Sequence, residues 1–246
     1  MIVRMRGRYG ELEIKFSKLR GPGANITRDF LRKMMYRIVV RATKYFDEAR
    51  LAGCEDHVFT YREKQFHSVV CPAIADITPW FLIEHPLYRK PAGEAEYPGT
   101  VDYWIYYKNY SFIMELKHSY FAYAKAGNPR KAITRKFLDA LSQLRNIRKD
   151  ECRSLTYGNG LRKIALEAIV FYKGAKEKSK LEEDIKSEGF KSLFKNLLRN
   201  SELTNKSNFH ALWILDKRFA VPFEYSDWFE IYPAVAFVGY ISDIIE

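Results

Sequence analysis

The stretch that most constrains this chain is GTVDYWIYYKNYSFIMELKHSYF, residues 99–121. Two runs of aromatic and aliphatic residues flank the tripeptide KNY, a pattern typical of a buried β-hairpin with one strand near 101–107 and another near 112–118. Asp102, Glu115 and Lys117 nevertheless stand in or beside these runs. Burying a charge is unfavourable unless it has a partner, so any fold of this chain must give these three side chains partners.

The alternation of side chains along a strand places two of these charges together. Glu115 and Lys117 are two residues apart and therefore share a face of their strand. If a two-residue turn follows Tyr107, then Tyr107 pairs with Tyr110 and Asp102 falls opposite Glu115. An even shift of this register keeps Asp102 on the same face. The sequence thus predicts two carboxylates and one ammonium group on one face of the hairpin.

Two interpretations account for this arrangement. Like charges directly opposite each other destabilise an antiparallel pair, and a divalent cation bound between Asp102 and Glu115 would reverse that effect. Oxygen ligands favour a hard ion such as Mg²⁺ or Mn²⁺, beside which Lys117 could orient a water or stabilise charge on a phosphate. The alternative is an ion pair between Glu115 and Lys117 on a solvated face, a common and weakly stabilising arrangement.

The rest of the chain alternates between helical and extended patterns. Apolar residues at helical spacing predict helices over 27–50, 61–77 and 130–149, and the charged segment 174–206 is expected to be helical and peripheral. Asn25 or Thr27 is the expected N-cap of the first helix. Apolar runs predict strands at 164–172, 210–215 and 233–241, and a weak alternation indicates one strand within 1–20. Residues 85–98 are rich in Pro and Gly, which predicts a loop. These elements predict one α/β domain over residues 1–246, a mixed central sheet flanked by helices.

The hairpin resembles the PD-(D/E)xK nuclease superfamily, whose fold is restriction-endonuclease-like. The likeness rests on Gly99-Thr-Val-Asp102, then twelve residues, then Glu115-Leu-Lys117 after the apolar lead-in SFIM. Val101 stands where many members have Pro. The resemblance implies that Asp102, Glu115 and the carbonyl of Leu116 hold Mg²⁺ (or Mn²⁺) and that Lys117 assists the attacking water.

Two further positions extend the resemblance, which covers about residues 61–172. Members often carry a Glu on the helix before the hairpin, and here Glu63 lies on the apolar stripe of that helix. Members also often carry a Gln or a basic residue on the helix after the hairpin, and here Gln143 and Lys136 share a face. The other interpretations are a first-turn Glu that favours the helix dipole and ordinary polar residues on a helix surface. The family core has the order αβββαβ, of which one strand is not evident in this sequence. Strands near 210–215 and 233–241 are expected to complete this core, whereas the N-terminal helix and residues 174–206 are additions to it.

The tripeptide pattern by itself is not specific. Glu13-Ile-Lys15 and Asp184-Ile-Lys186 also fit (D/E)xK. The first lacks an acidic partner on a preceding strand, and the second lies in a highly charged run. Apolar flanks and an upstream hairpin Asp single out Glu115-Leu-Lys117.

The charge distribution favours a polyanionic partner. The formal net charge is +11, and residues 1–50 hold 13 Lys/Arg against 5 Asp/Glu, whereas residues 51–124 hold 6 against 9. A mildly acidic segment between basic ones suits a site that holds cations while its rim holds an anionic substrate. The helix near 130–149 and its flank carry the residues that we expect to track a nucleic-acid backbone: Arg130, Lys131, Arg135, Lys136, Arg145 and Arg148.

Other classes of site find little support. The three cysteines, Cys54, Cys71 and Cys152, form no CxxC or Cys/His cluster, which argues against structural zinc and a disulfide framework. No P-loop, GxGxxG or GxSxG motif occurs. No apolar leader or span of 18 apolar residues is present, so we expect a cytoplasmic protein with reduced thiols and no membrane partner.

The sequence therefore predicts a Mg²⁺-dependent nuclease acting on phosphodiester bonds, with DNA as the expected substrate. One alternative is a nucleic-acid-binding or interaction protein that uses the same fold without catalysis. Another is a basic structural module whose hairpin charges merely pair. Oligomeric state stays open, and a homodimer is one arrangement that we retain.

Overall fold

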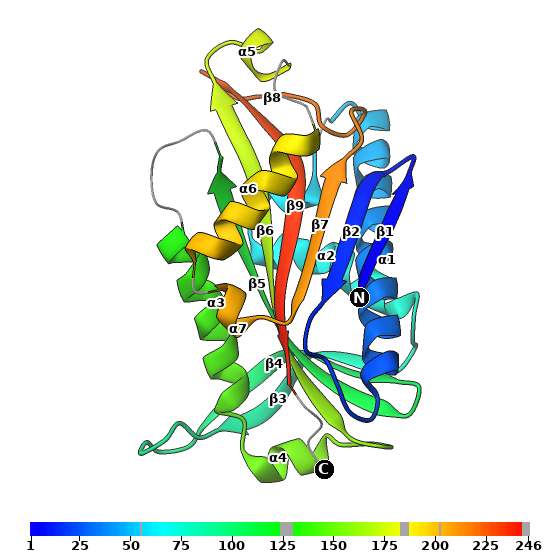
Figure 1. The fold of residues 1–246 in the computed structure, drawn as a ribbon, viewed down its shortest axis with the longest axis vertical. Coiled ribbons are helices and arrows are strands. Elements are labelled where there is room, and N and C mark those ends of the chain that lie inside the picture. The colour runs from blue at the N-terminus through cyan, green and yellow to red at the C-terminus, as the bar shows by residue number, and fades with distance from the viewer. Residues whose placement is uncertain (55, 124–129, 183–186, 202, 243–246) are drawn as a thin grey trace.

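The computed structural model describes residues 1–54, 56–123, 130–182, 187–201 and 203–242. Its centre is one mixed sheet of nine strands, flanked by helices on both faces (Figure 1). Within the sheet the strand order is β1-β2-β7-β9-β6-β5-β4-β3, and β8 pairs with β9. The expected mixed sheet between helices is therefore confirmed. Among the described residues, no helix combines the length and the apolarity needed to cross a membrane.

The first half of the chain forms an N-terminal hairpin, two helices and a three-stranded antiparallel unit. Its elements are β1 (Ile2–Gly7), β2 (Gly10–Phe16), α1 (Ala24–Leu51), the short 3₁₀ helix η1 (Val58–Thr60), α2 (Glu63–Ala75), β3 (Phe81–Arg89), β4 (Tyr97–Tyr107) and β5 (Tyr110–Ala122).

The second half begins with the helix that crosses from β5 to β6, and β6 pairs with β5 in parallel. Its elements are α3 (Arg130–Arg145), α4 (Lys149–Ser154), β6 (Leu161–Ala175), α5 (Ser179–Glu182), α6 (Ser187–Asn200), α7 (Leu203–Lys206), β7 (Phe209–Leu215), β8 (Phe223–Glu224) and β9 (Phe229–Ile241).

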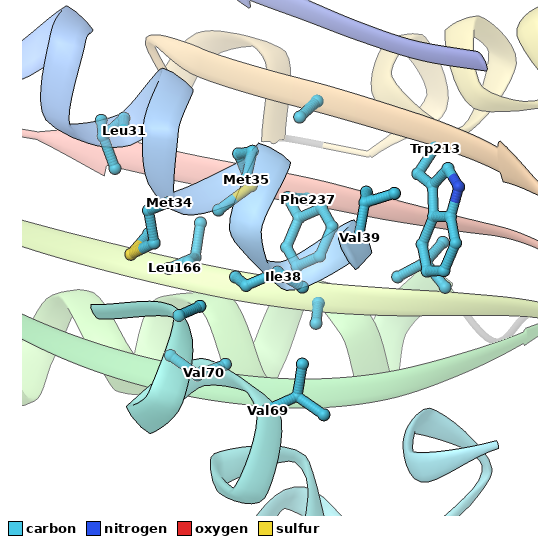
Figure 2. Close-up of a cluster of buried hydrophobic side chains, with 14 of the residues drawn as sticks. Leu31, Met34, Met35, Ile38, Val39, Val69, Val70, Leu166, Trp213 and Phe237 are labelled. Carbon is cyan, nitrogen blue, oxygen red and sulfur yellow. The ribbon is translucent and has the colours of Figure 1, made fainter. Parts of the chain in front are cut away.

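The two faces of the sheet bury separate apolar clusters. On one face, α1 and α2 present an aliphatic stripe to β5, β6, β7 and β9, and Figure 2 shows Met34, Ile38 and Val70 pointing toward Leu166 and Phe237. On the other face, α3 and α6 cover the side chains of the intervening strand residues, which point away from α1 and α2. This alternation follows from the two-residue period of a strand, and it explains why the inner strands are continuous apolar runs in the sequence.

Four expectations about the elements were wrong in detail. Residues 1–20 hold two paired strands, β1 and β2, because each continues the sheet beyond β7. The N-cap of α1 is Gly23, with a left-handed φ of 68°, so Asn25 and Thr27 both lie within the helix. Helix α6 is not peripheral, since its apolar face packs on the sheet through Phe190, Phe194 and Leu197.

The fourth difference is the most important for function. Residues 85–89 are not part of a loop but complete β3, an edge strand that pairs with β4 from Phe81↔Ile105 to Arg89↔Tyr97. Pro86 lies in this strand, and an edge position tolerates proline because its missing N–H is not needed on the open side. Strand β3 supplies the strand that the sequence left unidentified.

Candidate active site

The turn and register of the β4–β5 hairpin match the prediction. Lys108 and Asn109 both have positive φ, 46° and 64°, as a two-residue hairpin turn of this hand requires. Tyr107 pairs with Tyr110, and the ladder continues to Tyr103↔Met114. The next pair in this register would be Asp102 and Glu115, where the ladder stops.

Strand β4 leaves β5 at Asp102, and the carboxylate of this residue takes the place of a backbone acceptor. The N–H of Leu116 donates to Asp102 Oδ2 at 2.7 Å. In a continued ladder this N–H would face Val101, but the β4–β5 ladder ends at Tyr103↔Met114. The N–H and C=O of one strand residue point to the same neighbouring strand, so the Leu116 carbonyl faces the same opening as the Asp102 carboxylate.

Strand β3 is also irregular at this level. Its register places Glu84 opposite Asp102, and this one pair is missing between Ile83↔Tyr103 and His85↔Val101. Glu84 has a left-handed φ of 48°, an uncommon conformation for a residue with a side chain. Asp102 therefore lies where the ladders on both sides of β4 are interrupted, which frees its surroundings for polar contacts.

Glu115 is buried on the α3 face, 2% exposed, and is paired to a residue that the sequence did not single out. Arg89, the last residue of β3, places Nη2 2.5 Å from Glu115 Oε1. Burial, and to a smaller extent the charge of Asp102, raise the pKa of Glu115 to about 7 against the lowering effect of Arg89. The negative charge of Asp102 therefore acts on Glu115 and opposes its ionisation.

Lys117 reaches the first turn of α2. Its Nζ lies 3.5 Å from Glu63 Oε1, and both side chains are partly exposed. The ion pair between Glu115 and Lys117, the alternative to a metal site, is therefore not the main contact of either residue. Glu63 begins α2, where its charge also suits the helix dipole, and the next residues of its stripe, Phe66 and Val70, are buried. The structure thus places Glu63 of α2 beside Lys117 of the β4–β5 hairpin.

Glu167 is a further carboxyl group beside this site. It lies in β6 directly across from Lys117, is fully buried, and accepts a 2.5 Å hydrogen bond from Ser119 Oγ through Oε1. Burial raises its pKa to about 8, against the lowering effects of the Ser119 hydrogen bond and of Lys136. Oε2 is buried and has no hydrogen-bond partner among the described residues. A lone Glu within the apolar run IALEAIVFY was the sequence signal for this residue.

Helix α3 brings Lys136 and Gln143 to the same side of the sheet. Lys136 Nζ donates to the carbonyl of His118 at 2.5 Å, which directs this ammonium group toward β5. Gln143 is half-buried, and its Oε1 is enclosed without a hydrogen-bond partner in the described part of the chain. It lies one turn before Asn146, whose carbonyl accepts from the N–H of Lys90, next to Arg89. Neither Lys136 nor Gln143 is therefore an ordinary polar residue on a helix surface.

The other basic residues predicted to contact nucleic acid differ in availability. Lys131, Arg135 and Arg145 are exposed, whereas Arg148 forms ion pairs with Glu96 and Asp150 and Lys136 is turned inward. The side chain of Arg130 lies outside the described residues. The exposed face of α3 keeps three of the six predicted cations toward solvent.

The oxygen atoms around Asp102 suit a small divalent cation. Asp102, Glu115 and the Leu116 carbonyl supply hard ligands, and Mg²⁺ is commonly held by one or two carboxylates together with waters and substrate phosphate. No cluster of three or more His, Cys, Asp or Glu side chains that could hold a metal occurs among the described residues, so any ion here would depend on such a mixed set. One carboxylate oxygen of Glu115 is already engaged by Arg89.

Comparisons with protein-family models, with curated proteins and with solved structures give no match to this chain.

Proposed function

We propose that this protein is a metal-dependent nuclease that hydrolyses phosphodiester bonds, with DNA as its substrate, on a restriction-endonuclease-like fold. The observation that carries the proposal is the Asp102 carboxylate, which accepts the N–H of Leu116 at the point where β4 leaves β5 and whose charge acts on Glu115. Apart from the short helix α4, the order α2-β3-β4-β5-α3-β6 supports the fold assignment, because it is the αβββαβ order of the family that the hairpin motif resembles.

Each polar group has a chemical role in this proposal. Asp102, Glu115 and the carbonyl of Leu116 would hold Mg²⁺ or Mn²⁺, which neutralises phosphate charge and lowers the pKa of water. Lys117 stabilises charge that develops on the phosphate or orients the attacking water. Glu63, 3.5 Å from Lys117 Nζ, holds that ammonium group in place. Gln143 is retained as a contributor from α3 through its enclosed amide oxygen.

The direct test is cleavage of duplex and single-stranded DNA by the purified protein with Mg²⁺, Mn²⁺ or chelator. Glu115→Ala and Lys117→Ala should abolish metal-dependent cleavage and leave the circular dichroism spectrum unchanged. The chain supplies a matched control, since Glu13 and Lys15 form the same ExK pattern on β2. Glu13→Ala and Lys15→Ala should cleave like wild type. Full activity in Glu115→Ala and Lys117→Ala would sink the assignment.

A second candidate function is nucleic-acid binding without catalysis. The observation that favours it is the ion pair between Glu115 and Arg89, because a carboxylate held by an arginine is less available to a metal. This candidate predicts DNA binding that weakens steeply with salt and no cleavage with any divalent ion.

A further inference from the structure

Arg89 is a buried cation that is incompletely satisfied. It is 4% exposed, and Nη2 donates to both the Thr100 carbonyl and Glu115 Oε1. Nη1 is also buried, yet it has no hydrogen-bond partner among the described residues. A buried donor without a partner destabilises a protein by about 1–3 kcal/mol, and more when the group is charged. The free side of this guanidinium is therefore suited to a ligand.

The surrounding backbone holds Arg89 firmly. Arg89 pairs with Tyr97 of β4, and a β-bridge to Ile147 connects Arg89 to the segment after α3. Gly99 makes room for the side chain, since a Cβ at that position would lie 3.0 Å from Arg89 Nε. The guanidinium is thus fixed between the hairpin and α3, at one end of the candidate site.

The chemistry of this position favours an oxyanion. Asp102 and Glu115 would repel a phosphodiester, so a site that processes one needs fixed positive charge beside them. A guanidinium offers planar N–H donors that match two oxygens of a phosphate, and it stays protonated throughout the accessible pH range. Arg89 has one arm on Glu115 and one arm without a partner among the described residues, so the same guanidinium can contact Glu115 and an anion at once.

We propose that Arg89 is a catalytic residue that binds a non-bridging oxygen of the substrate phosphate through Nη1 while Nη2 keeps Glu115 in position. This inference rests on the proposed nuclease function. The competing explanation is that Arg89 only neutralises Glu115. The two explanations predict different effects of removing the guanidinium, because a mere neutraliser competes with metal for Glu115 and contributes nothing to the phosphate.

Three variants separate these explanations. Arg89→Met removes the charge, Arg89→Lys keeps it but loses the fork of donors, and Gly99→Ala crowds the guanidinium without changing any charge. Arg41→Met is the control, because Arg41 of α1 forms a partly exposed ion pair with Asp76 at the end of α2, on the opposite face of the sheet from α3. Each protein is measured for Mn²⁺ affinity by calorimetry, for duplex affinity by fluorescence anisotropy in Ca²⁺, and for single-turnover cleavage in Mn²⁺.

If Arg89 binds the phosphate, Arg89→Met should slow cleavage on the order of 10²–10³-fold, as removal of one transition-state donor does, and should weaken duplex binding. At a pH above the Glu115 titration midpoint of both proteins, its Mn²⁺ affinity should be equal to or tighter than that of wild type. Arg89→Lys and Gly99→Ala should show smaller losses of cleavage in the same direction, and Arg41→Met should match wild type.

Tighter Mn²⁺ binding together with wild-type cleavage in Arg89→Lys and Gly99→Ala would overturn the inference and leave the nuclease function standing. Absence of cleavage by the wild-type protein would overturn both. If Arg89→Met fails to fold by circular dichroism, the other two variants carry the test, and unchanged cleavage in both counts against the role.

Discussion

Asp102 Oδ2 accepts the backbone N–H of Leu116 at 2.7 Å, and this bond stands at the point where β4 separates from β5. An antiparallel ladder would normally continue here through backbone groups. A side-chain carboxylate in place of a carbonyl opens the hairpin and leaves charge in the opening. This charge and the buried groups around it should have measurable effects on metal binding and on stability.

Asp102→Asn tests the charge of this carboxylate separately from its hydrogen bond. Asparagine Oδ1 can still accept the Leu116 N–H, so thermal unfolding should change little. Mn²⁺ affinity should fall at least about tenfold, because one anionic ligand of a hard cation is lost. Calorimetric titration measures the affinity, and an unchanged value would remove Asp102 from the metal site.

The pKa of Glu115 makes metal binding depend on pH near neutrality. Because burial and Asp102 raise this pKa to about 7, the side chain is mostly protonated at pH 6 and mostly charged at pH 8. A metal competes with that proton, so Mn²⁺ affinity should rise as pH increases to about 7 and level off above it. Arg89 lowers this pKa, so Arg89→Met should move the midpoint to higher pH. A pH-independent affinity between about 5.5 and 8 would contradict the assignment of Glu115.

Glu167 should make the folded state less stable in alkali. Its pKa is raised from 4.5 to about 8 in the folded protein, so the unfolded chain holds fewer protons between these values and stability falls as pH rises through this window. Glu167→Gln cannot ionise and should flatten this part of the profile by roughly a few kcal/mol. Urea unfolding at pH 5 and pH 9 measures the difference. Parallel profiles for the variant and wild type would show that Glu167 does not titrate in this range.

Gly23 should be essential for joining α1 to the hairpin turn. Its φ is 68°, and a Cβ would lie 2.5 Å from the ring of Tyr110. Gly23→Ala should therefore destabilise the protein by about 2–4 kcal/mol through backbone strain and overlap. Gly21→Ala is the matched control, because Gly21 has a similar φ of 78° and no atom within 4 Å of its added Cβ. It should lose only about 1–2 kcal/mol. Equal losses in urea unfolding would mean that contact with Tyr110 contributes nothing.

The sequence by itself determined the local features of the site. The two-residue turn set the register of the hairpin, and the period of two predicted that Asp102, Glu115 and Lys117 share one face. Helical spacing likewise predicted α1, α2 and α3 and put Glu63 on the stripe of α2. These features depend on residues within about one element of each other, so a pattern of apolar positions is enough to find them.

Tertiary structure decided which charges meet. The Pro and Gly content of residues 85–98 predicted a loop, and only the pairing with β4 identifies residues 85–89 as part of strand β3. That pairing brings Arg89 to Glu115 across 26 residues, and the parallel pairing of β6 with β5 brings Glu167 beside Lys117 across 50 positions of sequence. Such contacts depend on how strands order themselves in the sheet, and that order follows from long-range burial, which no local periodicity encodes.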